Sequence, residues 1–479
     1  MLENLKQISP VIWEIGIGAK DFMNVPARIF ASEDMLGLVD RDRTIHQLIN
    51  VTSLPGIISY AMVMPDAHEG YGFPIGAVAA TDLSNGVISP GGIGYDINCG
   101  IRLLKSNLSY DDIKSRIDLV AKEINRYVPS GVGKAGRLQL SNADMEKVLN
   151  YGCKWAESML YTEDNDLKFI ESGGCLESAD SSKVSRNAID RGRDQLGTMG
   201  AGNHFVEVNR VQQIFDEEIA RAYGLYENQI VIQIHTGSRG LGHQVATDYI
   251  KQMLAIAPQY GITLPDRELS CVPVSSPEGQ SYFAAMSASA NFAWTNRQLI
   301  TWEIRQPWKN IFGESSGKLE ILYDVAHNIA KIEEHTVNGE KKKVLVHRKG
   351  ATRAFPAGHP EVPPEYRNVG QPVLIPGSMG TASYVLAGMK GSMELSFGSS
   401  CHGSGRVMSR TAARKKIDGE ELRDELNRMG INVQAGSFKG LSEEAPQAYK
   451  DVESVVNVVE EAGIAKKVVR LKPLAVIKG

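Results

Sequence analysis

The sequence predicts an α+β fold in which mixed β-sheets are surrounded by peripheral helices. Short apolar runs typical of strands and segments of helical periodicity both occur along the whole chain. They do not alternate regularly, which argues against a doubly wound parallel sheet and favours mixed sheets. No linker rich in Pro, Ser or Gly and no block of like charges divides the 479 residues, so we expect a single domain over residues 1–479.

The helices and strands are expected at the following positions. Residues 110–128, 241–255, 281–312, 418–429 and 448–462 are predicted to be helical, and the long, Ala-rich stretch 281–312 is typical of one or two buried helices. The last two segments each end at a glycine, Gly430 and Gly463, in the usual stop position. Nine apolar runs are predicted to be strands: 57–64, 75–80, 100–104, 205–208, 230–234, 319–325, 344–346, 373–375 and 468–476.

The composition argues against several classes of protein. The formal net charge is −4, so a globally basic surface is absent, although basic stretches such as 341–343 and 410–416 leave RNA binding open. Five cysteines without a C-x-x-C pair argue against a disulfide framework or a structural zinc module and fit a reducing cytosol. No signal-peptide pattern or apolar run near the ~18 residues of a membrane span occurs, so we expect a cytoplasmic protein with no membrane partner.

A glycine-rich segment, GGIGYDINCGIR over residues 91–102, places the carboxylate of Asp96 three residues before the thiol of Cys99. One interpretation is a turn that ends in a small buried cysteine. The other is half of a metal site, because carboxylate and thiolate groups are both metal ligands.

Three of the ten histidines stand at predicted strand ends beside Gly or Asn: His204, His235 and His327. Any one of them alone is better explained as a hydrogen-bonded structural residue. If all three converge with Asp96 and Cys99, five ligands are too many for one tetrahedral zinc that keeps a substrate position. They suit two metals that share the Cys99 thiolate, with Asp96 and His204 on one metal and the other two histidines on the second. Such a pair stabilises an in-line phosphoryl displacement, and the mixed ligands leave Mn²⁺ and Zn²⁺ open.

His402 lies in CHGSGR, a segment of glycines and hydroxyls that is followed by Arg406 and Arg410. This segment and PGSMGTASY upstream are not Walker A loops, but both can present backbone N–H groups to an anion. His402 is therefore either a covalent nucleophile toward a nucleotide α-phosphate or a structural histidine in a tight turn. Glu207 is either the partner of guanine N1–H and N2–H₂ or a surface carboxylate of a strand. His68 lies in a further distinctive motif, MPDAHEGYGFPIG.

Six motifs follow one another along the chain: GGIGYDINCGIR, GTMGAGNHFVEV, HTGSRGLG, VAHN, PGSMGTASYVL and SCHGSGRVMSR. Their sequences and order, with the terminal AVIKG, resemble those of the RtcB family of RNA ligases, the tRNA-splicing ligases. The resemblance covers about residues 55–479 and implies an RtcB-like α+β fold around a central metal and nucleotide cleft. It also implies an activity that depends on GTP and Mn²⁺. The implied reaction, in tRNA splicing and RNA repair, joins RNA ends that carry a 2′,3′-cyclic phosphate or 3′-phosphate to RNA ends that carry a 5′-hydroxyl. It proceeds through a histidine–GMP intermediate.

The resemblance also implies roles for individual residues. Asp96, Cys99 and His204 resemble the ligands of one Mn²⁺, whereas Cys99, His235 and His327 resemble those of the second. His402 resembles the histidine that carries GMP. The residues that resemble the guanine-nucleotide contacts are Asn203, His204, Phe205, Val206, Glu207, His327, Asn328, Pro376, Gly377, Ser378, Met379, Ser383, His402, Gly403, Ser404, Gly405 and Lys478. The implied partners are RNA, GTP and, for many family members, a small activating protein called archease.

Two other functions are compatible with parts of this pattern. A binuclear metallo-phosphoesterase would use the same five ligands, with His402 only binding phosphate. A non-catalytic RNA-binding subunit is disfavoured, because all presumed ligands and the nucleophile are present. Six arginines are candidates for binding RNA phosphates: Arg186, Arg193, Arg239, Arg353, Arg406 and Arg410.

Overall fold

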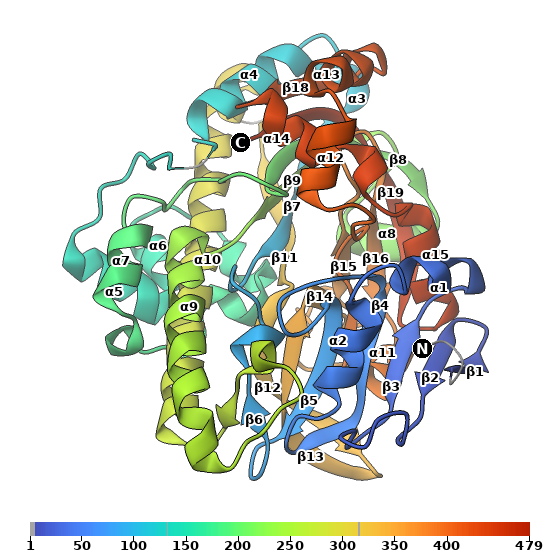
Figure 1. Cartoon of the computed structure of the whole chain (residues 1–479). Coiled ribbons are helices and arrows are strands. Elements are labelled where there is room, and N and C mark those ends of the chain that lie inside the picture. The colour runs from blue at the N-terminus through green and yellow to red at the C-terminus, as the bar shows by residue number, and fades with distance from the viewer. Residues whose placement is uncertain (1–4, 132, 315–316) are drawn as a thin grey trace.

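Two large β-sheets run through the molecule with helices packed against them, and the N-terminal end of the first sheet reaches the lower right edge of the view (Figure 1). The computed structural model describes residues 5–131, 133–314 and 317–479. The first sheet contains, in spatial order, β1 (Leu5–Ser9), β2 (Ile12–Ile15), β3 (Ala27–Phe30), β4 (Ile57–His68), β5 (Ile75–Asp82), β13 (Glu340–Lys349) and β12 (Asn328–Val337). The second contains β11 (Leu319–Ala326), β7 (Gly100–Ser109), β9 (Gln229–Thr236), β8 (Phe205–Ile214), β19 (Ala465–Lys478), β16 (Ser383–Gly388) and β15 (Pro372–Ile375), with β18 (Asn432–Ala435) beside β19.

Parallel and antiparallel pairs occur in both large sheets. The pairs β3–β4 and β18–β19 are parallel, and their other neighbouring strands are antiparallel. Two short antiparallel pairs complete the set: β6 (Val87–Ile88) with β10 (Val272–Pro273), and β14 (Ala351–Arg353) with β17 (Ser399–Cys401). The predicted α+β fold with mixed sheets is confirmed.

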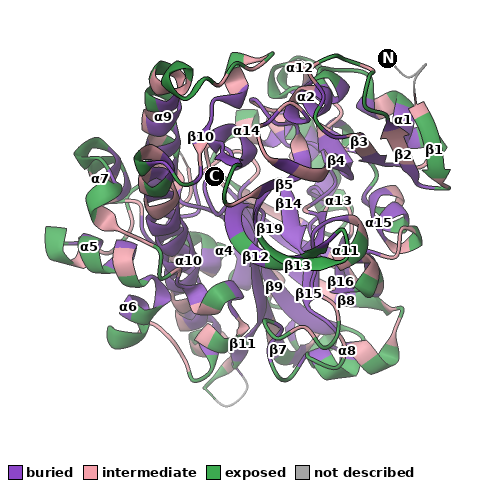
Figure 2. Ribbon diagram, turned by 90° about the horizontal axis from the view of Figure 1, so that it is seen from below, coloured by how far each residue is buried: buried purple, intermediate pink, exposed green. Residues whose placement is uncertain are grey.

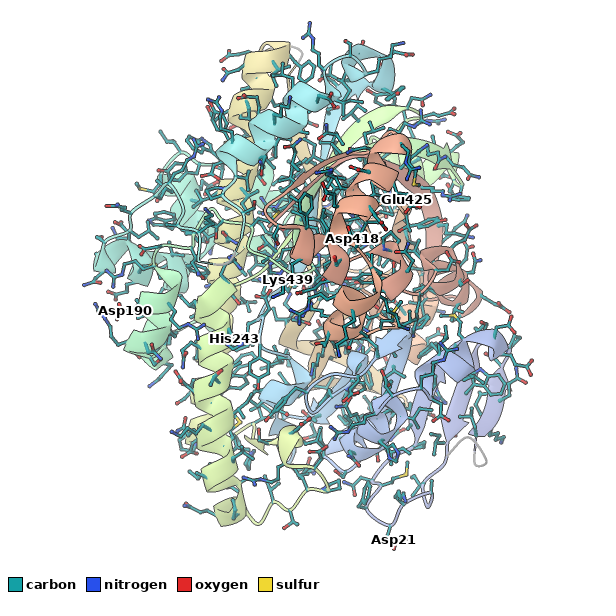
Figure 3. All side chains as sticks on the ribbon, turned by 45° about the horizontal axis from the view of Figure 1, so that its top comes forward. Asp21, Asp190, His243, Asp418, Glu425 and Lys439 are labelled. Carbon is teal, nitrogen blue, oxygen red and sulfur yellow. The ribbon has the colours of Figure 1, made fainter. Side chains whose placement is uncertain are left out.

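Helices pack against the two sheets, whereas β1 and alternate residues of β12 stay exposed. The helices are α1 (Glu33–Val39), α2 (Thr44–Val51), α3 (Tyr110–Ile113), α4 (Ile117–Tyr127), α5 (Asn142–Tyr151), α6 (Cys153–Ser158), α7 (Arg186–Gly192), α8 (Glu217–Tyr223), α9 (Arg239–Ile256), α10 (Pro277–Phe312), α11 (Lys390–Leu395), α12 (Arg410–Lys416), α13 (Gly419–Arg428), α14 (Phe438–Glu443) and α15 (Val452–Glu461). Figure 3 shows charged side chains such as Asp190, Glu425 and Lys439 on the outside of this layer. None of the helices in the described ranges combines the length and apolar character needed to cross a membrane.

The core is formed by the sheets and by α10. Every residue of β9 is buried, which is expected for a strand covered on both faces. Figure 2 shows buried residues concentrated in the sheets and along α10, whereas α5, α7 and α8 expose their outer sides. From Ala285 to Arg305, α10 is buried on nearly all sides. A helix in such surroundings can place polar side chains only where other buried groups receive them.

Most of the predicted elements are confirmed. All nine predicted strands are present, and 281–312 forms one helix, α10. Gly430 and Gly463 take positive φ values of 81° and 72°, as expected at helix stops. The continuous helix predicted over 110–128 is wrong. It is divided into α3 and α4, because Ser109 and Asp112 form a capping box around a separate first turn and Arg116 leaves helical geometry.

Candidate active site

One edge of the second sheet carries four of the predicted ligands. Cys99 directly precedes β7, and His204 directly precedes β8. His235 is the penultimate residue of β9, and His327 directly follows β11. Because neighbouring strands here are antiparallel, the start of one lies beside the end of the next, and Ile101 pairs with His235. The sheet register therefore brings the four residues together.

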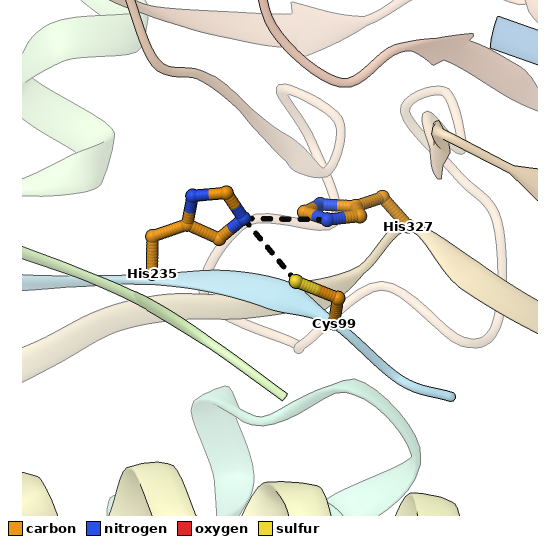
Figure 4. A group of neighbouring side chains, drawn as sticks. All are labelled: Cys99, His235 and His327. Atoms are coloured by element: carbon orange, nitrogen blue, oxygen red, sulfur yellow. Dashed lines mark hydrogen bonds between the residues drawn. The ribbon is translucent and has the colours of Figure 1, made fainter. Parts of the chain in front are cut away.

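The ligand atoms of all five predicted residues meet at this edge. Cys99 Sγ lies 3.3 Å from His235 Nε2 and 3.4 Å from His204 Nε2. Figure 4 shows that His235 Nε2 also faces His327 Nε2, at 3.4 Å. Asp96 Oδ2 lies 2.9 Å from His204 Nε2. The cluster divides into Cys99–His235–His327 and Asp96–Cys99–His204, and within each group the ligand atoms lie within 4.8 Å of one another. Cys99 belongs to both groups.

Contacts outside the cluster orient Asp96 and His204. The Nδ1–H of His204 donates to Met199 O at 3.0 Å, which leaves a lone pair on Nε2. This lone pair faces the Asp96 carboxylate, and two acceptors at such a distance need a proton or a metal ion between them. A Cβ atom on Gly237 would lie only 2.4 Å from Asp96 Oδ1, so glycine is required to leave room for the carboxylate.

The chemistry of this donor set fits two divalent metal ions. Burial, followed by the effect of neighbouring histidines, holds the pKa values of His235 and His327 well below the ordinary value, so both rings are neutral and can coordinate. Burial opposes the ionisation of Asp96, but the contact with His204 outweighs burial and lowers the pKa of Asp96. Burial raises the pKa of the Cys99 thiol. A bound divalent ion is the usual means by which such a thiol ionises.

His402 lies beside the cluster, in the loop after β17. Its ring centroid is 4.8 Å from that of His327. Its Nδ1 lies 2.6 Å from Asp66 Oδ2, which also accepts the backbone N–H groups of His402 and Gly403 at 3.0 and 3.3 Å. A carboxylate that accepts Nδ1–H fixes the tautomer in which Nε2 carries the lone pair. His402 Nε2 is therefore available as a nucleophile or a base.

Asp66 is held in place by an irregular part of β4. The register between β4 and β5 shifts between Val63 and His68, so the intervening residues leave the regular ladder. The buried ammonium of Lys450 donates to Pro65 O at 2.9 Å and to Ala67 O at 2.6 Å. These two bonds flank Asp66 and hold the backbone from which its carboxylate extends.

A cavity of about 700 Å³ opens onto His402 and onto the edge of the ligand cluster. This volume is in the range of small-molecule sites. The predicted nucleotide contacts on its wall are Asn203, Phe205, Glu207, Pro376, Gly377, Ser378, Met379, His402, Gly403, Ser404, Gly405 and Lys478. His68, Arg406, Arg410, Glu444 and Tyr449 line it as well.

Glu207 is a buried wall residue, with only 4% of its surface exposed. The interpretation as a surface carboxylate is therefore wrong, because the Glu207 side chain lies on the cavity wall and not on the outer surface. Burial raises the pKa of Glu207 to about 8, although Asn209 and Lys478 act to lower it. Ionisation of a buried carboxyl group is unfavourable unless hydrogen-bond donors face it, and a ligand in the cavity can supply such donors to Glu207.

Several predicted nucleotide contacts do not reach the cavity wall through their side chains. Val206 packs in the core, because alternate residues of β8 face opposite sides. Ser383 Oγ accepts the N–H of Gly377 at 3.0 Å. Asn328 Nδ2 donates to Asp96 O at 3.1 Å. The last two predicted contacts, His204 and His327, face the ligand cluster. These side chains support the walls of the site.

Sequence reasoning missed two carboxylates of the site. Asp66 stands two residues before His68 in the motif MPDAHEGYGFPIG, and that motif was the available signal. Glu444 accepts from Arg406 Nη1 at 3.2 Å and from Arg410 Nε at 3.0 Å. Its segment shows no distinctive pattern, so only the fold reveals it.

The prediction that Arg353 contacts RNA is wrong. Its side chain is 1% exposed and pairs with the buried Glu171 and with Glu361 at the surface. The other arginines keep at least part of their side chain near the surface or the cavity. Of these, Arg406 and Arg410 line the cavity.

Comparisons with a family model and with known proteins give one and the same name. The family model described as "tRNA-splicing ligase RtcB" matches residues 47–479. A Thermococcus kodakarensis protein named tRNA-splicing ligase RtcB is 55% identical over 477 residues, 99% of each chain. Proteins of the same name from Archaeoglobus fulgidus and Nanoarchaeum equitans are 52% and 53% identical, again over 99% of each chain.

The chain belongs to the RtcB family. The resemblance seen in the six motifs is thereby confirmed, and with it the class of protein, an enzyme that acts as a ligase. The RtcB motifs also account for the geometry. GGIGYDINCGIR, GTMGAGNHFVEV, HTGSRGLG and VAHN each supply part of the ligand cluster, and SCHGSGRVMSR supplies His402.

Proposed function

We propose that this RtcB-family enzyme is an RNA ligase of tRNA splicing and RNA repair that uses GTP and two Mn²⁺ ions. It joins RNA ends with a 2′,3′-cyclic phosphate or 3′-phosphate to 5′-hydroxyl ends. The observation that carries the proposal is the His402–Asp66 pair, which lies where a nucleotide-sized cavity meets a cluster of five metal-ligating side chains. Relatives named tRNA-splicing ligase support the RNA substrate.

In this proposal His402 is the nucleophile. With Nδ1–H held by Asp66, Nε2 attacks the α-phosphorus of GTP. A P–N bond forms while the bond from phosphorus to the bridging oxygen breaks, and pyrophosphate leaves. The Asp66 charge stabilises the positive charge that develops on the ring. GMP then passes to the RNA 3′-phosphate, which hydrolysis supplies when the end is cyclic, and the 5′-hydroxyl finally displaces GMP.

The ligand cluster and the cavity wall supply the charge that phosphoryl transfer requires. Asp96, Cys99 and His204 would hold one Mn²⁺, and Cys99, His235 and His327 the other. Bound divalent ions neutralise charge on the reacting phosphoryl group. Ser404 Oγ is buried and has no hydrogen-bond partner within the described residues, so it is available to a phosphate oxygen.

The proposal also includes a location in the cytoplasm and names the kind of protein that would activate the enzyme. Cys99, Cys153, Cys175, Cys271 and Cys401 are all free, which supports the reducing environment of the cytoplasm. An activating partner of the archease type stays a prediction from the resemblance.

The proposal is tested by incubating the protein with Mn²⁺ and α-labelled GTP in the absence of RNA. We expect acid-labile label on the protein, close to one GMP per chain, and none on His402→Ala. His46→Ala is the matched control, since His46 is an exposed histidine of α2. Absence of an adduct on the wild-type protein, or equal labelling of His402→Ala, would contradict the mechanism.

GTP binding is expected to depend on pH through Glu207. The ionised carboxylate accepts guanine N1–H and N2–H₂, but the pKa of about 8 keeps Glu207 mostly protonated at pH 7. Guanine binding therefore releases a proton, so affinity rises with pH and levels off above pH 8. Between pH 7 and 8 we expect an increase of about 5-fold. Calorimetric titration with GTP measures it, and Glu207→Gln should bind weakly without this pH dependence. A wild-type affinity independent of pH would contradict the assignment.

The ligand cluster alone is also compatible with a binuclear metallo-phosphoesterase. That enzyme would hydrolyse phosphodiesters without GTP, and His402→Ala would retain most of its metal-dependent activity. The His402–Asp66 pair favours the ligase, because an imidazole oriented by a carboxylate serves nucleophilic attack rather than simple phosphate binding.

A further inference from the structure

Arg297, in the middle of α10, is fully buried and uses all of its N–H donors. Nε and Nη2 donate to the two carboxylate oxygens of Asp324, both at 2.9 Å. Nη1 donates to Asn98 O and to Thr236 O, both at 2.8 Å, and Nη2 donates also to Asn98 Oδ1 at 3.0 Å. The guanidinium therefore joins three separate segments of the chain.

Each of these segments carries a residue of the ligand cluster. Asn98 directly precedes Cys99, and Thr236 directly follows His235. Asp324 lies in β11, three residues before His327. Asn98 itself has a φ of 53°, in the left-handed region that few non-glycine residues adopt. Its hydrogen bonds to Arg297 help to hold the backbone in the shape that presents the Cys99 thiol.

We propose that Arg297 is a positioning residue that fixes the relative places of Cys99, His235 and His327 from behind the ligand cluster. The inference rests on the proposed metal centre. Arginine suits this task because its planar group offers five donors in fixed directions, whereas lysine offers three from one nitrogen. Groups that orient metal ligands from outside typically contribute a factor of roughly 10 to 100 to metal affinity.

A second buried arginine of the same helix provides a matched control. Arg305 is 1% exposed and pairs with Asp166 at 2.6 and 2.8 Å. It also donates to Leu319 O at 3.0 Å, and none of these partners adjoins a ligand. Loss of Arg305 therefore reports the cost of disturbing a buried arginine in α10, without the effect on the cluster.

The test compares Arg297→Lys, Arg305→Lys and the wild type, all prepared without metal. Each protein is titrated with Co²⁺, because its thiolate charge-transfer band reports coordination by Cys99 independently of activity. Melting temperatures of the metal-free proteins are measured alongside. We expect Arg297→Lys to bind Co²⁺ roughly 10- to 100-fold more weakly than the wild type. Arg305→Lys should bind Co²⁺ like the wild type, even if its melting temperature falls by as much as that of Arg297→Lys.

Asn98→Gly extends the test if Arg297→Lys does not fold. Glycine accepts the positive φ but removes the Oδ1 acceptor of Arg297, together with the bond from Asn98 Nδ2 to Ala290 O. Weaker Co²⁺ binding at unchanged melting temperature would support the proposal. The proposal is overturned if Arg297→Lys binds Co²⁺ as tightly as the wild type. If Arg297→Lys is unfolded, wild-type Co²⁺ affinity in Asn98→Gly overturns it instead. Equal losses of Co²⁺ affinity in Arg297→Lys and Arg305→Lys also overturn it. A wild-type protein that binds no Co²⁺ would instead overturn the metal centre, and this role with it.

Discussion

Asp66→Asn is expected to slow the labelling of His402 by GTP roughly 10²- to 10⁴-fold, while the protein stays folded. The Asp66 side chain is 0% exposed, and its Oδ2 atom accepts three N–H groups from His402 and Gly403. An amide removes the negative charge that stabilises the ring as it becomes cationic. A 10³-fold loss corresponds to about 4 kcal/mol of transition-state stabilisation.

The measurement is a single-turnover time course of GMP transfer to the protein at saturating GTP and Mn²⁺. Asp82→Asn is the control, because Asp82 ends the neighbouring strand β5 and accepts from Ser84 in an exposed turn. Its rate should match that of the wild type. If Asp66→Asn labels His402 at the wild-type rate, the carboxylate has no part in activating the ring.

Cys99→Ser is expected to remove both metals together, whereas Asp96→Ala removes mainly one. The Cys99 sulfur lies 3.3 Å from His235 Nε2 and 3.4 Å from His204 Nε2, so it contributes to both groups of ligands. A serine hydroxyl is a poor replacement, because it remains protonated where a thiol ionises on the metal. Ligation activity should fall in parallel with the loss of metal.

Elemental analysis after gel filtration gives the number of metal ions per chain. We expect two for the wild type, close to none for Cys99→Ser and about one for Asp96→Ala. Cys175→Ser, a change at a buried cysteine outside the cluster, should keep both. A full complement of metal in Cys99→Ser would show that the sulfur does not bridge.

The ligand cluster could be predicted from the sequence because its residues are rare types in unusual settings. Cys99, His204, His235 and His327 each stand within two residues of a Gly or an Asn at the end of an apolar run, and strand ends are common places for functional groups. The antiparallel register that brings them into contact was not readable, since pairing such as Ile101 with His235 depends on the whole sheet. The motifs indicated what could bind a metal, and the fold determines that the groups meet.

The residues that orient the ligands and the cavity side chains could not be predicted, because their residue types are common. Asp66, Glu444 and Arg297 are common residue types, and what distinguishes them is burial beside a particular partner. The burial of Arg353 likewise depends on Glu361 and Glu171, which lie in different segments of the chain. The division of residues 110–128 was missed because apolar periodicity continues across Arg116 although the backbone turns there.

The place of β19 in the second sheet has a consequence for how the enzyme folds. This strand lies between β8 and β16, and Lys478 pairs with Phe205 across the chain. Both residues line the cavity. Contacts this distant in sequence form late, because closing a long loop costs entropy before any pairing is gained. A refolding chain should therefore form its secondary structure before the cavity is complete, and in the proposed function GTP binding would follow that step.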